Sequence, residues 1–179
     1  GGGYRSNGTF LLLEIASKLL KLHPSVKFLI PKIFSPIAFE IECRNYIKEK
    51  ELENNVCLYS PVLSTEIMSI LNQGTIAVMP NLRVRKNEIA IPTKLFEYMA
   101  AGLPIVSSDL PYQKKIISEN KIGLLAKPEN LLSFVNTIKI LVEDRKYAME
   151  LGKNGQKLFI EKFNWESQMP ALNNYYLEI

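Results

Sequence analysis

The sequence predicts an α/β protein whose doubly wound parallel sheet is covered by helices on both faces. Short apolar runs alternate along the chain with longer segments of helical periodicity. Continuous apolar runs are typical of strands buried on both faces, and their alternation with helices indicates a parallel sheet. With 179 residues the chain has the size of one domain, and it contains no internal repeat.

Helix ends are marked by proline and glycine. Residues 9–22 carry apolar side chains on a helical period, and the helix is expected to stop before Pro24. Residues 92–101 form a second clear helix, because Pro92 suits its first turn and Gly102 its C-terminal end. The same criteria favour helices at 39–50, at 65–71 with Ser64 as N-cap, and at 112–119, 131–142, 145–162 and 165–177, the last interrupted at Met169-Pro170.

The expected strands fall between these helices, at residues 26–30, 55–59, 75–79, 105–108 and 123–126. In the common strand order 3-2-1-4-5-6, a ligand binds at the carboxyl ends of the strands between the first and fourth. The loop after the first strand would be residues 1–8, and the loop after the fourth is the long polar segment 81–91. The first strand itself, which would be central, is expected to precede Gly1.

The composition excludes several classes of protein. Lys and Arg number 22 against 18 Asp and Glu, and they are scattered, so we expect no nucleic-acid partner. One histidine, His23, excludes a His-built zinc site, and Asp109 and Asp144 are too far apart for an Asp-x-Asp pair, so we expect no metal. Cys43 and Cys57 have no metal-site spacing and indicate a cytoplasmic chain, with a peripheral membrane location open for the full-length protein.

The N-terminal loop is glycine-rich and leads into a helix. Gly2 and Gly3 allow backbone N–H groups to approach a phosphate, and Arg5 can pair with it, although a flexible N-terminus would have the same composition. An NAD site is disfavoured, because no acid follows the second strand at Pro31-Lys32.

The most informative segment is the helix at 92–101. Lys94 and Glu97 are three residues apart and share one helix face near its N-terminus, where an anion would be stabilised. Glu97 can accept two hydroxyls of a ribose. The alternative is an ordinary surface pair of Lys and Glu, which contributes only a few tenths of a kcal/mol.

This helix and its flanks resemble the signature of the retaining GT-B glycosyltransferases, the glycosyl transferases group 1 family. The segment Pro92-Thr93-Lys94-Leu95-Phe96-Glu97-Tyr98 fits its "Pro-x-Lys-x-Phe-Glu-Tyr" pattern. The sequence Ala100-Ala101-Gly102-Leu103-Pro104-Ile105-Val106, followed by Ser108-Asp109, fits the rest, and Gly123-Leu124-Leu125, Pro128 and Asn164-Trp165 resemble later parts of the pattern.

Two positions depart from that family. Its first acid should stand eight residues before Glu97, where this chain has Ile89; Glu88 is adjacent and is the candidate replacement. The first loop of the family has a lysine before glycine, whereas here Asn7 precedes Gly8.

The resemblance implies a Rossmann-like, C-terminal half of a GT-B fold at residues 1–162, followed by a C-terminal helix at 163–179. It implies that Glu97 holds the ribose, that Gly2, Gly3, Arg5 and Lys94 hold the diphosphate, that Thr93 also binds the donor nucleotide, and that Glu88 orients the sugar. Glu88 and Lys94 are then the catalytic candidates. The implied donor is a nucleotide-diphosphate sugar, used as substrate without a separate cofactor.

The same resemblance places the acceptor, a glycan or a lipid-linked sugar, on an N-terminal domain outside these residues. We expect the chain to be inactive alone and, through the apolar side chains of its last helix, able to self-associate. Two alternatives stay open: a non-catalytic nucleotide-binding or scaffolding domain of the same fold, and a GT-B nucleotide-sugar epimerase.

Overall fold

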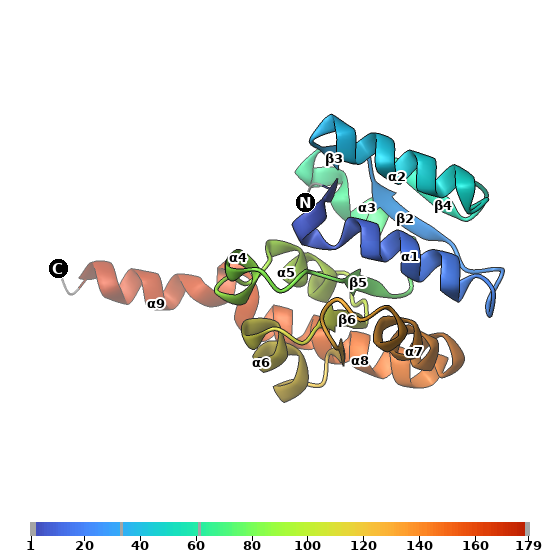
Figure 1. The fold of residues 1–179 in the computed structure, drawn as a ribbon. Helices are drawn as coiled ribbons and strands as arrows, with labels where there is room; N and C mark the ends of the chain where they lie inside the picture. The colour runs from blue at the N-terminus through green and yellow to red at the C-terminus, as the bar shows by residue number, and fades with distance from the viewer. Residues whose placement is uncertain (1–2, 33, 61, 178–179) are drawn as a thin grey trace.

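A computed structural model describes residues 3–32, 34–60 and 62–177, and it confirms the α/β class. Strands form a central layer with helices on both faces (Figure 1). The strands are β1 (Gly3–Tyr4), β2 (Phe28–Pro31), β3 (Phe34–Ser35), β4 (Val56–Tyr59), β5 (Ala77–Met79), β6 (Ile105–Ser108) and β7 (Gly123–Ala126). The α-helices are α1 (Thr9–Leu19), α2 (Ile37–Glu49), α3 (Ile67–Leu71), α4 (Arg85–Glu88), α5 (Thr93–Ala100), α6 (Pro111–Glu119), α7 (Leu131–Glu143), α8 (Arg145–Leu158) and α9 (Trp165–Leu177). The 3-10 turns η1 (Arg5–Asn7) and η2 (Ser64–Glu66) and the π-helix η3 (Phe159–Phe163) complete the list.

All strand pairs among the described residues are parallel, but they form three separate groups. β5, β6 and β7 pair in that order, β2 pairs with β4, and β1 pairs with β3. The register sets Phe28 opposite Val56, and it sets Val106 between Val78 and Leu124. These pairings fit the two sides of the expected order 3-2-1-4-5-6, and no described strand lies between β2 and β5.

The two faces of the strand layer pack into two apolar clusters. Successive residues of β6 belong to different clusters, because side chains of a strand alternate between faces. Val106 packs with Phe134 of α7 in the cluster that also includes α1, α2, β2 and β4. Ile105 packs with Leu95 of α5 in the cluster that includes β5, α6 and α8.

Local side-chain chemistry explains several helix ends. Asn130 and Asp144 cap α7 and α8, accepting hydrogen bonds from the backbone N–H groups of Ser133 and Tyr147, each at 2.9 Å. Gly102 follows α5 with φ of +66°, the left-handed conformation that ends many helices. The expected stop at Gly102 is therefore confirmed.

Three local expectations are wrong. Ser64 is not the N-cap of a helix, because it begins η2 and the backbone N–H of Leu63 donates to the Glu66 carboxylate at 3.0 Å. The polar segment 81–91 is not wholly irregular, since it contains α4. The N-terminal loop contains β1, a strand too short to leave a pattern in the sequence.

The interruption expected at Pro170 is also absent, because α9 runs through that residue. Proline removes one backbone donor, but an exposed helix can tolerate this loss because water solvates the freed carbonyl. In Figure 1, α9 projects away from the rest of the fold. Its Trp165 and Tyr176 are exposed. Among the described helices, none combines the length and apolar character that a membrane crossing requires.

Candidate functional site

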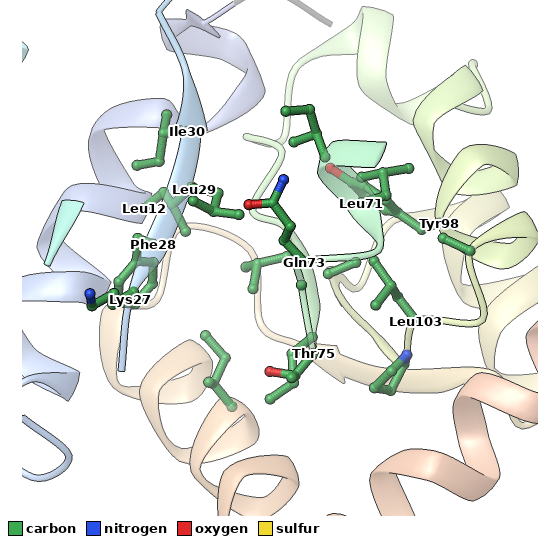
Figure 2. Close-up of a pocket in the computed structure, with 18 of the residues that line it drawn as sticks. Leu12, Lys27, Phe28, Leu29, Ile30, Leu71, Gln73, Thr75, Tyr98 and Leu103 are labelled. Carbon is green, nitrogen blue, oxygen red and sulfur yellow. The ribbon is translucent and has the colours of Figure 1, made fainter. Parts of the chain in front are cut away.

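A cavity of about 1040 Å³ separates β2 from β5. Figure 2 shows Phe28, Leu29 and Ile30 of β2 on one side, and Leu71 and Leu103 on the other. Helices α1, α3, α5, α7 and α8 provide the remaining walls. Most of this lining is apolar, so the polar groups at its ends decide what the cavity can bind.

At the carboxyl end of the cavity, β4 and α5 contribute three polar side chains. Tyr59 is the last residue of β4, and Lys94 and Glu97 lie on the first two turns of α5. Lys94 and Glu97 share one face of α5, as their spacing predicts. This is the edge at which parallel sheets of this class bind ligands.

Burial shapes the electrostatics of this group. Desolvation lowers the pKa of Lys94 below its ordinary value, and the negative charge of Glu97 opposes that shift. An anionic ligand at the N-terminus of α5 would add a second favourable charge beside the ammonium. The site therefore holds a partly buried cation that gains stability when an anion binds.

Two tyrosines interact electrostatically with the Glu97 carboxylate. Desolvation raises the pKa of Tyr98 far above its usual range, with Tyr59 and Glu97 adding to the effect. Desolvation also raises the pKa of Tyr59, and Glu97 is the second cause. Both phenols therefore stay protonated, and each hydroxyl can donate a hydrogen bond to a neighbouring oxygen.

A buried asparagine joins the two loops of this edge. The side-chain amide of Asn87 donates to the carbonyl of Ser6 at 2.8 Å and to that of Leu82 at 2.9 Å. The backbone N–H of Leu82 also donates to Ser6, at 3.0 Å. Segment 81–89 is thereby fixed against the N-terminal loop, as the expected switch point requires.

Gly8 allows the closest approach between these loops. A Cβ at this position would lie 1.7 Å from the carbonyl oxygen of Pro80, and φ is +75°. Only glycine can occupy this point, because any side chain would meet backbone. The N-terminal loop therefore lies against the end of β5 at Gly8.

Only some of the residues expected to bind the diphosphate line the cavity. Gly3 and Lys94 line the cavity. The Arg5 guanidinium instead pairs with the Glu42 carboxylate of α2 and lies 4.7 Å from the centre of the Phe39 ring. Gly2 lies outside the described residues, and Thr93 is exposed at the start of α5.

Glu88, the candidate for the sugar-contacting acid, is the last residue of α4 and does not line the cavity. Its carboxylate lies 3.9 Å from Nε of Arg83. The backbone N–H of Arg83 in turn donates to the Glu129 carboxylate at 3.0 Å, and its guanidinium donates to the Asp109 carbonyl at 3.2 Å. Loop 81–89 is thus charged, and its one acid, Glu88, is paired with Arg83.

Sequence reasoning missed Tyr59 and Asn87. Tyr59 ends a predicted strand, so its position at the carboxyl edge was available from the sequence. Asn87 left no such signal, because its role depends on two carbonyl groups brought together by the fold. Within residues 3–32, 34–60 and 62–177, no three His, Cys, Asp or Glu side chains gather in a way that could hold a metal ion.

This sheet, with a charged group on α5 at its carboxyl edge, defines an α/β domain of the Rossmann-like type. The chain belongs to the glycosyl transferases group 1 family, whose sequence pattern matches residues 4–158.

Curated relatives agree with this assignment. The amylovoran biosynthesis glycosyltransferase AmsK of Erwinia amylovora is 33% identical over 88 residues, which are 49% of this chain and 22% of that protein. The D-inositol 3-phosphate glycosyltransferase of Paenarthrobacter aurescens is 21% identical over 163 residues, 90% of this chain and 38% of that protein. The chain thus spans well under half the length of these relatives.

Solved structures share the fold. HepE of Anabaena, in complex with UDP, has a TM-score of 0.86 at 14% identity over all of this chain and 47% of that one. S. aureus TarM, in a complex that includes UDP, has a TM-score of 0.78 at 25% identity, over 94% of this chain and 32% of that one. The C-terminal domain of LpcC, a group 1 family protein from Francisella tularensis, has a TM-score of 0.78 at 20% identity, over 90% of this chain and 82% of that one.

Proposed function

We propose that this chain is the donor-binding, C-terminal half of a GT-B glycosyltransferase that transfers a sugar from a nucleoside-diphosphate sugar with retention. The observation that carries the proposal is the placement of Lys94 and Glu97 side by side on α5, at the carboxyl end of the cavity. The UDP complexes of HepE and TarM support a nucleotide donor.

In this proposal the Glu97 carboxylate accepts hydrogen bonds from the two ribose hydroxyls. A carboxylate offers two oxygens, so it can accept both hydroxyls at once. Lys94, Thr93 and the N-terminal N–H groups of α5 hold the diphosphate. Gly2 and Gly3 bring backbone N–H groups toward the same anion.

The diphosphate is the leaving group, and negative charge grows on it as the sugar–phosphate bond breaks. Lys94 and the positive end of α5 stabilise that charge in the partly desolvated cavity, where the interaction is stronger than in water. Arg5 adds a second cation when it exchanges Glu42 for phosphate. This arrangement neutralises the leaving group with protein cations, so the proposed transfer is independent of metal.

Glu88 orients the hydroxyls of the transferred sugar from the rim, in the place of the acid that the family pattern puts one residue later. The acceptor binds to a separate N-terminal domain that closes over this edge. The share of its relatives that the chain spans supports such a partner domain. A glycan or a lipid-linked sugar is the proposed acceptor.

Thermal unfolding with UDP, GDP, ADP, CDP and dTDP, each with EDTA, tests the donor site. A ligand at a hundred times its dissociation constant stabilises the chain by about 2.7 kcal/mol, a shift of several degrees. We expect one nucleotide to give such a shift and thereby to identify the base.

A matched pair of variants tests the ribose assignment. Glu97→Gln should weaken nucleotide binding about tenfold, since hydrogen bonds to a charged acceptor are the stronger ones. Glu119→Gln, at an exposed position of α6, should bind normally. Equal binding by both variants would remove Glu97 from the site, and binding without sugar transfer by the full-length protein would favour a non-catalytic domain.

A further inference from the structure

We propose that Glu129 is a positioning residue for sugar transfer: its carboxylate fixes loop 81–89, and this loop holds Glu88 where it orients the transferred sugar. The inference rests on the proposed function, because it takes Glu88 as the acid that contacts that sugar. It adds a contribution from the loop between β7 and α7, which supplies none of the residues proposed to touch the donor.

The backbone of Glu129 has an unfavourable conformation. Its φ is +59°, in the left-handed region that glycine adopts more readily than residues with a Cβ. Two other described non-glycine residues have a positive φ, Glu51 and Lys121, and they follow the C-caps of α2 and α6, where this conformation is common. Glu129 instead lies between β7 and Asn130, the N-cap of α7. Such a conformation persists only where the surrounding structure compensates for it.

A long-range hydrogen bond of the Glu129 side chain provides this compensation. The carboxylate accepts from the backbone N–H of Arg83 at 3.0 Å. Arg83 lies before the first residue of α4, so that helix offers no partner to its N–H group. A charged acceptor makes a stronger hydrogen bond than a neutral one, and Glu129 therefore anchors the start of loop 81–89.

Arg83 transmits this constraint to Glu88. The Arg83 guanidinium donates to the carbonyl of Asp109 at 3.2 Å, and its Nε lies 3.9 Å from the Glu88 carboxylate. The backbone and the side chain of Arg83 are thus both held by the loops that follow β6 and β7. Without Glu129, the Arg83 backbone can turn toward water, and Glu88 then loses a partner with a fixed position.

The turn before α7 is closed without the Glu129 side chain. The backbone N–H of Lys127 donates to the Ser133 hydroxyl at 2.8 Å, and the backbone N–H of Asn130 donates to the Lys127 carbonyl at 3.2 Å. Glycine at position 129 would form the same turn with less strain. The glutamate side chain is therefore needed for the contact with loop 81–89 and not for the turn.

Three variants separate the carboxylate from the turn. Glu129→Gly removes the carboxylate and relieves the positive φ, whereas Glu129→Gln keeps an acceptor oxygen of the same reach. Lys121→Gly is the matched control, because it relieves a positive φ at an exposed position that does not contact loop 81–89. Both glycine variants should melt within about 3 °C of the natural chain, since relief of strain offsets the greater freedom of unfolded glycine.

Amide hydrogen exchange measures the contact itself. The Arg83 amide should exchange about fivefold faster or more in Glu129→Gly, because its acceptor is gone. In Glu129→Gln and Lys121→Gly its rate should stay within about twofold of the natural rate. An equal rate in all four proteins would overturn the proposal.

Binding of UDP-glucose and of UDP, measured by calorimetry, tests the link to the sugar; solved complexes of HepE contain each of these probes. Glu129→Gly should bind UDP normally and UDP-glucose about fivefold more weakly, since only the glucose can contact Glu88. Glu129→Gln and Lys121→Gly should bind both probes normally. Equal affinities of Glu129→Gly and the natural chain for UDP-glucose, or equal losses for both probes, would overturn the positioning role.

Failure of the proposed function gives a different result. A natural chain that binds neither probe would overturn the donor site for uridine nucleotides. The exchange rate of the Arg83 amide would still decide, in the same variants, whether Glu129 holds loop 81–89.

Discussion

The β5–β6–β7 half and the β2–β4 half of the molecule bury their strands very differently. All four residues of β6 are buried, including Ser107 and Ser108. β2 reads Phe-Leu-Ile-Pro and is the more apolar strand, yet Leu29 is 39% exposed. Burial in this fold is therefore decided by how many neighbours a strand has, and not by its own hydrophobicity.

The covering helices reinforce this difference. α7 covers one face of β6, α5 and α6 pack on the other, and α8 contributes residues to both clusters. The helices that pack against β2 are α1 and α2, and the cavity separates this strand from β5. The buried serines of β6 are tolerated because Ser108 donates to the carbonyl of Asn81 at 2.6 Å and Ser107 to that of Ser108 at 3.3 Å.

The largest expected effect comes from placing the same charged side chain in β6 and in β2, which tests whether the two strands differ in burial. Val106→Lys should destabilise the chain by about 4 kcal/mol or more, because it buries an unpaired ammonium in a fully covered strand. Leu29→Lys should cost about 1 kcal/mol or less, since its long side chain can reach the open cavity. Urea unfolding measures both. Similar losses would show that the two strands are equally buried in solution.

A second test concerns close packing within the β5–β6–β7 half. A Cβ at Gly152 of α8 would lie 2.1 Å from the carbonyl oxygen of Gly102, whereas a Cβ at Gly155 meets nothing nearer than 3.7 Å. Gly152→Ala should therefore cost about 3 kcal/mol, and Gly155→Ala should be neutral or stabilising by up to about 1 kcal/mol. Thermal and urea unfolding check the difference. Equal stability of the two variants would contradict the close contact of α8 with the turn after α5.

Asn87 tests the connection between the two halves. Asn87→Asp keeps the shape but replaces the donor with an oxygen that faces the carbonyls of Ser6 and Leu82. We expect a loss of about 2 kcal/mol in the free energy of unfolding. Asn45→Asp, at an exposed position of α2, is the matched control and should change stability little. A loss as small as that of the control would show that the two loops are joined by the Leu82–Ser6 hydrogen bond alone.

The smallest expected effect is a pH dependence in the β2–β4 half. Burial raises the pKa of Cys43 to about 11, and the charge of Glu42 adds to the shift. The thiol ionises near pH 9 in the unfolded chain but only near pH 11 in the folded chain. The free energy of unfolding therefore decreases as pH rises from about 9 to 11, because ionisation favours the unfolded state over that range.

The variant Cys43→Ala has no thiol to ionise, so its free energy of unfolding lacks this pH dependence. The difference in free energy of unfolding between the natural chain and the variant should therefore decrease by about 1 kcal/mol between pH 8 and pH 10.5. Exposed Cys57 is the control, and Cys57→Ala should show no narrowing. A constant deficit for Cys43→Ala would mean that the thiol is accessible to water in the folded chain.

The sequence allowed the regular elements of the β5–β6–β7 half to be predicted closely. β6 and β7 lie at the expected residues, because each is a continuous apolar or small-residue run between proline or glycine signals. β1 and β3 were not predicted, since a two-residue strand has no periodicity. The α4 turn was missed for the same reason.

The relative placement of side chains could be predicted where residues share one element. Lys94 and Glu97 were placed together by helical spacing alone, and both line the cavity. Arg5 illustrates the limit, because its pairing with Glu42 joins residues far apart in the sequence. Glu42 becomes the partner of Arg5 because α2 packs against α1, and the spacing of residues along the chain does not reveal that packing.

The contact of Gly8 with Pro80 has a consequence for sequence drift. The backbone of Gly8 contacts the backbone of Pro80 directly, so glycine is the only residue that this fold tolerates at position 8. Ser6, two residues away, contributes its carbonyl to Asn87 and Leu82, and most side chains could supply the same atom. In a saturation library, position 8 should therefore remain glycine and position 6 should accept many residues. The fold constrains the backbone path of the N-terminal loop more than its side chains.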